Sequence, residues 1–353
     1  MHQAVFTSCR EIYRHEPRNP EEVIVVEGLL TDKPGPHLIK LTGTGLIWEG
    51  EAAENLSGLN AIGPTYIRGA SITVSDDTGN RFEFSEESPG HYYSTPDLIA
   101  VEGRSYRLHI ITANGHDYES AEQNLPGRVS LDTILARKTE KERLMQSHQG
   151  TYSVRMIPGL DVIADISGTG IEKPLFRLVT QDLLLYTQTF ANHQNFLWKK
   201  LYMPDNININ METFGQGSAT VKDHEVTFMS MRKEDLHIDW EDDFRPHRRV
   251  LLFRMYSLNE ESWNFYSAIH EQIHSEGRLF DPMAKQLPSN IYSLSGKGKL
   301  ALGHFEVSRV TRKSWVVVET PWQEFYPLRE TDDLHHIPDF GKTFIEPPDF
   351  WVD

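Results

Sequence analysis

Residues 70–84 decide the fold class, because they place two alternating segments on either side of a turn. The first segment is Ala70-Ser71-Ile72-Thr73-Val74-Ser75, in which polar and apolar side chains alternate with period two. The turn is Asp77-Thr78-Gly79-Asn80, and the alternation resumes in Arg81-Phe82-Glu83-Phe84. Period-two alternation around a glycine-containing turn is typical of a β-hairpin with one buried face.

Similar short segments lie on both sides of this hairpin, and turn residues separate them. We expect further strands at Val23–Gly28, His37–Leu41, His91–Tyr93, Tyr106–Ile111 and His116–Tyr118, with a long loop at 45–65. Strands at this spacing predict an antiparallel β-sandwich over residues 23–125. The order of its glycines and tyrosines resembles the transthyretin or carboxypeptidase-regulatory type of immunoglobulin-like domain.

A polar region at 121–150 follows the sandwich and contains the charged stretch Arg137–Arg143. We expect a solvated helix or linker here. The predicted division of the chain is therefore an N-terminal anchor region and tether at 1–22, the sandwich at 23–125, and a second β-rich domain at 126–353.

The second domain is also predicted to be sandwich-like. Expected strands are Leu160–Ile166, Leu175–Val179, Leu183–Tyr186 and Val250–Tyr256, an edge strand at Asn206–Asn210, and a hairpin made by Leu300–Val307 with Ser314–Val318. Residues 320–353 are rich in proline and aromatic residues. We expect them to form an irregular tail that packs Phe340, Phe344, Phe350 and Trp351 on this domain, because four exposed aromatic side chains would favour aggregation.

One helix is predicted, at 258–276. Ser257 and Glu260 have the spacing of a capping box, and Gly277 stands where a left-handed helix end is expected. An apolar stripe follows from residues spaced three and four apart: Trp263, Tyr266, Ile269 and Ile273.

Composition limits the classes of partner. The 353 residues include 39% hydrophobic and 24% charged residues, which is typical of a globular protein. The net charge of −16 argues against nucleic acid or anionic lipid as the partner, because both attract basic patches. No run of 18 apolar residues occurs, so we expect no membrane-spanning helix.

Cys9 is the only cysteine in the chain, so neither an internal disulfide nor a cysteine-based zinc site is expected. It ends the string Phe6-Thr7-Ser8-Cys9, in which small residues precede the cysteine as they do in bacterial lipoprotein signals. Only eight residues precede it, fewer than a signal peptide needs. The string therefore leaves two interpretations open, a lipidated cysteine or a free one.

The string His270-Glu271-Gln272-Ile273-His274 has the H-E-x-x-H pattern on the predicted helix. In zinc proteases the two histidines hold the metal and the glutamate activates water. Gly277 extends the pattern, but Phe280 stands where its third ligand should be. We therefore expect no metal site here, and we interpret His270 and His274 as packing residues near a helix end that favours a cation.

Several further segments together resemble one family. They are Val25–Asp32, Pro34–Leu41, Leu252–Leu258 with Trp263 and Tyr266, Gly277–Pro282, Pro288–Ile291, Leu302–Ser308 and Pro348–Trp351. With Cys9 they extend over nearly the whole chain. Their order resembles a family of outer-membrane lipoproteins of Bacteroidota that is catalogued as a domain of unknown function (number forty-two forty-nine).

The resemblance implies that Cys9 is lipidated and that no zinc motif belongs at the helix. It also implies a role beside TonB-dependent receptors, near which members of the family are often encoded. Many members carry a cysteine pair near the C-terminus, whereas residues 315–351 contain none, so any such bridge is absent here.

We expect from these observations a non-catalytic lipoprotein on the cell surface, an accessory ligand-binding partner of a TonB-dependent transporter in nutrient uptake. No cofactor, catalytic residue or ligand-binding residue is predicted. Two alternatives stay open: a zinc metallopeptidase that uses His270, Glu271 and His274, and a structural or adhesive envelope protein.

Overall fold

The computed structural model describes twelve segments of the chain: 23–43, 65–146, 151–169, 171–190, 193–201, 207–209, 219–230, 245–273, 287–294, 300–318, 325–328 and 343–344. Several predictions lie outside the described residues. They concern Cys9, the tether at 10–22, nearly all of the loop at 45–65, His274, Gly277, and the packing of Phe340, Phe344, Phe350 and Trp351.

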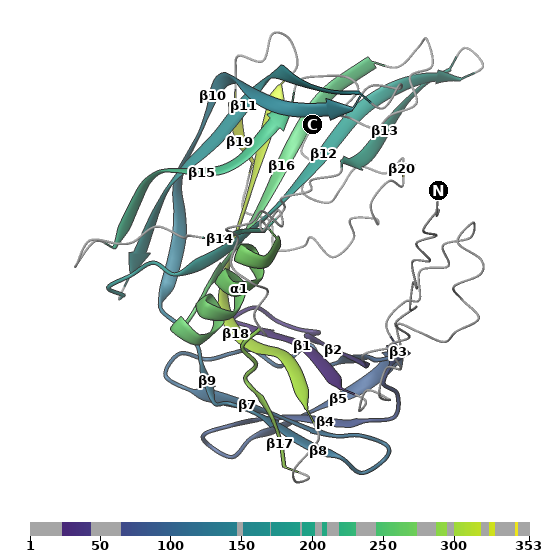
Figure 1. Cartoon of the computed structure of the whole chain (residues 1–353), viewed down its shortest axis with the longest axis vertical. Coiled ribbons are helices and arrows are strands. Elements are labelled where there is room, and N and C mark those ends of the chain that lie inside the picture. The colour runs from purple at the N-terminus through teal and green to yellow at the C-terminus, as the bar shows by residue number, and fades with distance from the viewer. Residues whose placement is uncertain are drawn as a thin grey trace, which may run out of the picture.

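The protein is mainly β, as predicted, with one helix among the described residues. Figure 1 shows a sandwich of strands at the bottom, a second group of long strands at the top, and helix α1 (Glu260–Ile273) between them. The finer prediction, an immunoglobulin-like order of strands in the first sandwich, stays a prediction.

Two sheets form the N-terminal sandwich. One contains β1 (Ile24–Thr31), β2 (Leu38–Gly43), β3 (Thr65–Tyr66) and β6 (His91–Tyr93). The other contains β4 (Ser71–Asp76), β7 (Ser105–Ile111), β8 (Asp117–Ser120), β9 (Gln123–Asn124) and β17 (Ile291–Ser293). Strand β5 (Arg81–Ser88) pairs with β4 of one sheet and with β6 of the other.

The predicted hairpin at 70–84 is confirmed. Strands β4 and β5 pair antiparallel with Ile72 opposite Phe84 and Val74 opposite Phe82. The carboxylate of Asp76 accepts hydrogen bonds from the backbone N–H groups of Thr78 and Asn80 and closes the turn.

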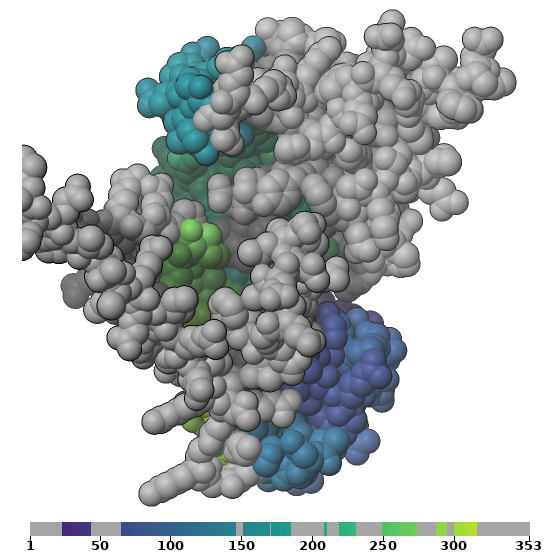
Figure 2. Space-filling view, turned by 45° about the vertical axis from the view of Figure 1, so that its right-hand side comes forward, coloured from purple at the N-terminus to yellow at the C-terminus, as the bar shows by residue number. Residues whose placement is uncertain are grey.

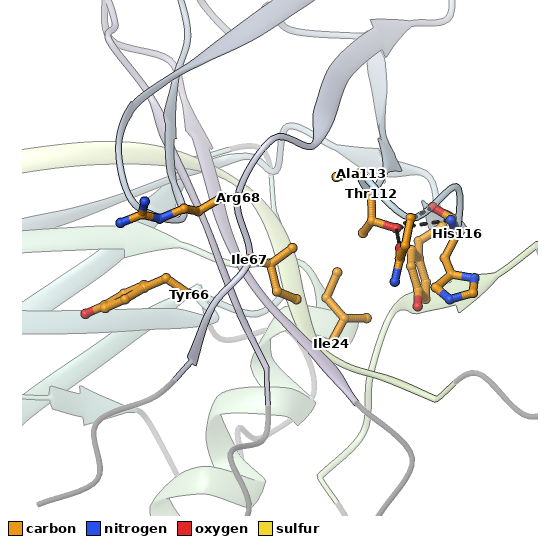
Figure 3. A pocket seen from close by; sticks show the side chains of 9 residues that line it. Ile24, Tyr66, Ile67, Arg68, Thr112, Ala113 and His116 are labelled. Carbon is orange, nitrogen blue, oxygen red and sulfur yellow. Dashed lines mark hydrogen bonds between the residues drawn. The ribbon is translucent and has the colours of Figure 1, made fainter.

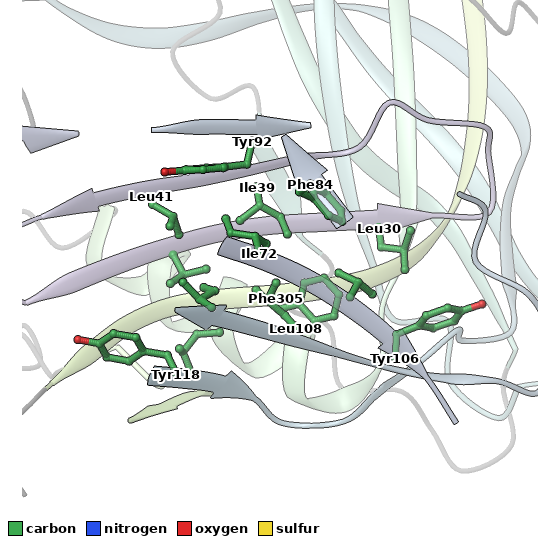
Figure 4. Close-up of a cluster of buried hydrophobic side chains, with 14 of the residues drawn as sticks. Leu30, Ile39, Leu41, Ile72, Phe84, Tyr92, Tyr106, Leu108, Tyr118 and Phe305 are labelled. Carbon is green, nitrogen blue, oxygen red and sulfur yellow. The ribbon is translucent and has the colours of Figure 1, made fainter. Parts of the chain in front are cut away.

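Buried side chains of both sheets meet in one core (Figure 4). Ile39, Leu41 and Tyr92 come from the first sheet, and Ile72 and Leu108 come from the second. Phe305 and Val307 belong to the same core, although they lie far beyond residue 125 in the sequence. The N-terminal sandwich is therefore completed by residues from near the other end of the chain.

Residues 128–146, predicted as a solvated helix or linker, form the strand β10 (Arg128–Gln146), so that prediction was wrong. The strand pairs along its length with β11 (Tyr152–Thr169), and β15 (Thr220–Ser230) lies on the other side of β11. Lys141, in the charged stretch, forms ion pairs with Asp161 and Glu225 of these neighbouring strands. Tertiary pairing thus outweighs the weak local preference of this polar sequence.

The second sandwich packs this three-stranded sheet on a larger one. The larger sheet contains β12 (Phe176–Phe190), β13 (His193–Leu201), β14 (Ile207–Ile209) and β16 (Arg245–Ser257). The predicted strands at 175–179 and 183–186 are parts of the single strand β12. Phe176, Leu178 and Phe253 face Val162 and Ile166 of β11 in a second core.

The predicted hairpin of residues 300–307 with 314–318 was wrong, because both segments belong to one continuous strand, β18 (Ala301–Val318). Residues 301–308 pair parallel with β1 of the N-terminal sandwich, and residues 309–318 pair antiparallel with β16 of the second. The intervening residues contain no glycine or proline to turn the chain. Strand β18 therefore joins the two sandwiches.

Helix α1 begins at Glu260, within the predicted range, but the predicted capping residue was wrong. Asn259 is the cap, since its side-chain Oδ1 accepts the backbone N–H of Ser262 at 2.8 Å. Ser257 instead ends strand β16, and its hydroxyl accepts the backbone N–H of Val129. Trp263 and Tyr266 pack inward as expected, whereas Ile273 is exposed.

The region predicted as an irregular tail contains two short strands. Strand β19 (Phe325–Leu328) pairs with β18, and β20 (Thr343–Phe344) pairs with β13. The open edges of the second sandwich provide the hydrogen-bonding partners for these segments. Among the described residues, no helix has the length and apolar character needed to cross a membrane.

Candidate functional site

A cavity with a volume of about 900 Å³ lies between the two sandwiches and helix α1. Strands β1 and β2 of the N-terminal sandwich form one wall, strands β12, β16 and β18 form a second, and the helix covers a third side. Figure 2 shows part of the helix, in green, at the molecular surface above the N-terminal sandwich, in purple and blue.

The first wall is the outer face of a sheet whose inner face packs into the N-terminal core. Side chains alternate along β1, so Ile24 and Val26 are buried in the core while Glu27 and Leu29 line the cavity. The ammonium group of Lys40, on β2, lies 3.0 Å from the carboxylate of Glu27. This wall therefore combines apolar side chains with an exposed ion pair.

The second wall is basic. Arg254 of β16 stands directly opposite Arg312 of β18, and the next pair on the same face of the sheet is Tyr256 with Val310. Arg177 of β12 stands opposite Tyr256. Because strand side chains alternate in direction, these five residues share the face that lines the cavity.

A buried ionic cluster lies beside this wall. The Arg177 Nη2 donates to both carboxylate oxygens of Glu306, at 3.0 and 3.2 Å. The Tyr266 hydroxyl donates to the same carboxylate at 2.6 Å, and the Ser308 hydroxyl also donates to it. Since these residues lie on β12, β18 and α1, the cluster connects the helix to the sheet.

Arg177 lies between two aromatic rings, with its guanidinium carbon 4.1 Å from the ring centre of Tyr256 and 4.5 Å from that of Tyr266. Burial alone would lower the pKa of Arg177, but the charge of Glu306 outweighs it and raises the pKa. Burial and the same carboxylate raise the pKa of Tyr266 well above its ordinary value. Arg177 is therefore a permanent cation and Tyr266 a neutral hydrogen-bond donor.

His304 lies at the edge of the cavity under the helix. Its Nε2 is 2.8 Å from the Ser262 hydroxyl, and its ring stacks on Phe265 with centroids 4.7 Å apart. Burial lowers the pKa of His304 to about 4. The imidazole is therefore neutral at pH 7 and serves as a packing and hydrogen-bonding group.

The charge of the cavity differs from that of the whole chain. The described residues that line it include five basic side chains and one acidic one, Glu27. The basic ones are Lys33, Lys40, Arg177, Arg254 and Arg312. The chain as a whole carries a net charge of −16. Basic side chains are thus concentrated at the cavity, which can attract negative charge.

A second, smaller cavity of about 290 Å³ lies at one end of the N-terminal sandwich. Figure 3 shows Tyr66 and Arg68 on one side of it and Thr112 and His116, from the β7–β8 turn, on the other. This cavity is smaller than the usual binding site for a small molecule. The larger cavity is therefore the better candidate.

The H-E-x-x-H string lies only partly within the described residues. His270 is half-buried in the last turns of α1 and Glu271 is exposed, while His274 lies beyond the described part of the helix. No group of three histidine, cysteine, aspartate or glutamate side chains that could hold a metal occurs in the described segments. The prediction about this string stays untested, as does the prediction about Cys9.

Sequence reasoning did not identify the cavity residues. Arg254 and Arg312 stand among apolar or β-branched neighbours in Phe253-Arg254-Met255 and Val310-Thr311-Arg312. A charged residue within a strand of apolar residues is the signal that could have indicated them, because charged side chains are rare among the buried residues of a strand. Their assembly depends on the register of β16 and β18, which are far apart in the sequence.

The fold and the cavity define a class of protein: a β-rich protein of two sandwiches joined by a shared strand, with a basic cavity between them. Comparison with family models identifies it more closely, since residues 10–314 match the model described as Domain of unknown function (DUF4249). The match includes every described residue that lines the cavity, and the chain belongs to this family. No curated protein matches the chain.

Proposed function

We propose that this protein is a non-catalytic binding protein that takes up a small molecule in the cavity between its two sandwiches. One observation carries the proposal: the volume of about 900 Å³ lies within the range of small-molecule sites. The lining fits as well, because apolar side chains such as Leu29 and Ile269 alternate with a few polar groups.

The setting we propose is the outer membrane, with the protein anchored through a lipid on Cys9 and exposed at the cell surface. In this setting it is an accessory partner of a TonB-dependent transporter in nutrient uptake. Support comes from the string Phe6-Thr7-Ser8-Cys9 and from the resemblance to Bacteroidota lipoproteins. A cavity open to a hydrophilic exterior suits a protein that passes a ligand to a transporter.

The cavity is tested with a neutral fluorescent probe, N-phenyl-1-naphthylamine, titrated into the purified protein. Leu29→Trp fills part of the cavity and should weaken probe binding about tenfold or more, because the added ring occupies the space the probe needs. Leu135→Trp is the matched control. Leu135 is 52% exposed on β10, away from the cavity, so this variant should bind the probe as the wild type does.

Equal binding by the wild type and both variants would refute the proposed cavity. Loss of binding in Leu29→Trp alone would support it, provided that circular dichroism and the thermal midpoint show an intact fold.

The zinc metallopeptidase remains the second candidate because of the H-E-x-x-H string. Glu271→Gln removes the group that would act as general base, and this change typically lowers turnover 10²–10⁴-fold in such an enzyme. We expect the purified protein to hold no stoichiometric zinc and to show no peptidase activity that depends on Glu271. Tightly bound zinc together with activity lost in Glu271→Gln would establish the enzyme instead.

A further inference from the structure

We propose that the cavity binds an amphipathic anion, a small molecule with a carboxylate or phosphate group on an apolar body. The inference rests on the proposed function and adds the chemical class of the ligand. Three features of the cavity carry it: the placement of three arginines on one wall, the state of the Arg177 side chain, and the apolar residues that face them.

The arginines stand in adjacent rows of the sheet. Arg254 and Arg312 are directly opposed on β16 and β18, and Arg177 lies one row away on β12. The guanidinium groups of Arg254 and Arg312 both line the cavity, so together they create a positive potential that attracts an anion. A guanidinium carries five N–H donors in a planar fork, so it can bind a protein neighbour and a ligand oxygen at the same time.

Arg177 provides the second feature. Arg177 is only 8% exposed, and its Nη2 donates to the carboxylate of Glu306. Its Nε, also buried, has no hydrogen-bond partner among the residues that the structure describes. Arg177 lines the cavity as a permanent cation, so its guanidinium adds to the positive potential of this wall.

The third feature is the apolar surface opposite the arginines. Leu29 and Leu38 come from the outer face of the N-terminal sandwich, and Phe265 and Ile269 come from the helix. Burial of an apolar body against these side chains provides affinity in proportion to the area removed from water. The cavity therefore has a basic wall for a charged group and apolar walls for the remainder of the molecule.

The inference is tested with a matched pair of fluorescent probes. 8-Anilinonaphthalene-1-sulfonate carries one negative charge, whereas N-phenyl-1-naphthylamine has the same aromatic body without it. We expect the wild type to bind the anionic probe about tenfold or more tightly than the neutral one, since hydrogen bonds to charged groups are the strong ones. The affinity for the anionic probe should fall with added salt, and that for the neutral probe should not.

The double variant Arg254→Gln/Arg312→Gln should reduce this preference about tenfold or more, because it lowers the affinity for the anionic probe far more than the affinity for the neutral probe. Arg81→Gln, on the exposed end of β5, is the control and should change neither affinity. Arg177 is left intact, because its loss would leave the Glu306 carboxylate buried and unpaired. The salt dependence of the wild type provides the same test without any substitution.

The outcomes separate the two proposals. If the neutral probe binds in the cavity and the anionic probe binds no more tightly, the anion inference is overturned and the proposed function stands. If neither probe responds to Leu29→Trp, both are overturned. If the anionic preference survives in the double variant and does not depend on salt, the arginines do not recognise the charge. If the anionic preference is lost in the double variant, competition by decanoate and by decyl phosphate identifies which headgroup the site prefers.

Discussion

Individual residues determine how helix α1 is held. The carboxylate of Glu306 accepts hydrogen bonds from Arg177, Tyr266 and Ser308, so one buried acid joins a strand pair to the helix. Replacement of Glu306 by glutamine therefore alters the contacts with all three of these partners at once. A comparable change at an exposed ion pair affects only a weak contact.

The first prediction concerns this acid. Glu306→Gln should lower the free energy of unfolding by about 3–5 kcal/mol, because it leaves the Arg177 cation buried without its counter-charge. Glu27→Gln removes the exposed partner of Lys40 and should cost less than about 1 kcal/mol. Urea denaturation of both variants measures the difference. Similar losses in the two variants would show that the buried cluster contributes no more than a surface pair.

The second prediction concerns pH. Burial lowers the pKa of His304 to about 4 in the folded protein, below the ordinary value of 6.5. Between these two values the unfolded chain binds a proton that the folded protein does not, so stability falls as the pH falls through this range. The contribution of His304 is about 3 kcal/mol, from 1.36 kcal/mol per pKa unit.

Urea denaturation at pH 7 and at pH 4.5 checks this prediction. His304→Gln should lose less stability than the wild type between these two pH values, and an NMR titration should place the pKa of His304 near 4. Parallel loss of stability in the two proteins would contradict the assignment.

At the level of elements, strand β18 connects the two sandwiches. Its first half pairs with β1 and its second half with β16, so a single strand belongs to both sandwiches. One face of it contributes Phe305 and Val307 to the N-terminal core. The other face contributes Glu306, Val310 and Arg312 to the buried cluster and the cavity.

The third prediction tests the pairing of β1 with β18. Gly303 has a φ of +101°, and a Cβ there would lie 1.9 Å from the carbonyl oxygen of Val26. Gly303→Ala should therefore lower the free energy of unfolding by about 3 kcal/mol or more, because backbone strain and overpacking add. Thermal unfolding with calorimetry measures the loss.

Gly79→Ala is the matched control for this prediction. Gly79 has a similar φ of +90°, but a Cβ there would meet no atom within 4 Å. It should cost only about 1 kcal/mol, the part that comes from backbone conformation. Equal losses in the free energy of unfolding at the two positions would show that the close approach of Gly303 to Val26 does not restrict the side chain at position 303.

At the level of the whole molecule, the two sandwiches and the helix enclose the cavity together. The inner faces of the sheets form the two cores, and the outer face of one sheet meets the basic face of another across the cavity. The proposed function depends on this arrangement, because neither sandwich alone supplies both the apolar and the basic wall.

The fourth prediction concerns the place of the molecule in the cell. If Cys9 receives a lipid, each buried CH₂ of the acyl chains contributes about 0.8 kcal/mol to membrane binding. Cys9→Ser in the full gene should then move the protein from the membrane fraction to the soluble fraction. Fractionation followed by immunoblotting measures the distribution. Equal partition of the wild type and the variant would exclude the anchor.

Local sequence determined much of the secondary structure. The alternation at 70–84 predicted strands β4 and β5, and the apolar spacing after Asn259 predicted helix α1, because these signals lie within one hairpin or one helix. Where the signal was weak, the prediction was wrong. Residues 128–146 were interpreted as a polar segment, but Val129, Leu131 and Ile134 are buried in the second core and the strand pairs with β11 along its length.

Only the tertiary structure decided the site. Arg177, Arg254 and Arg312 lie on three strands, and their side chains share a face because the register of β12, β16 and β18 aligns them. Strand β18 was expected to fold back on itself, and it instead continues as one strand from the N-terminal sandwich into the second. Hydrophobic periodicity indicates which face of a strand is buried, but it does not indicate which distant strand becomes its neighbour. The strand partners, and with them the cavity, are set by packing of the whole chain.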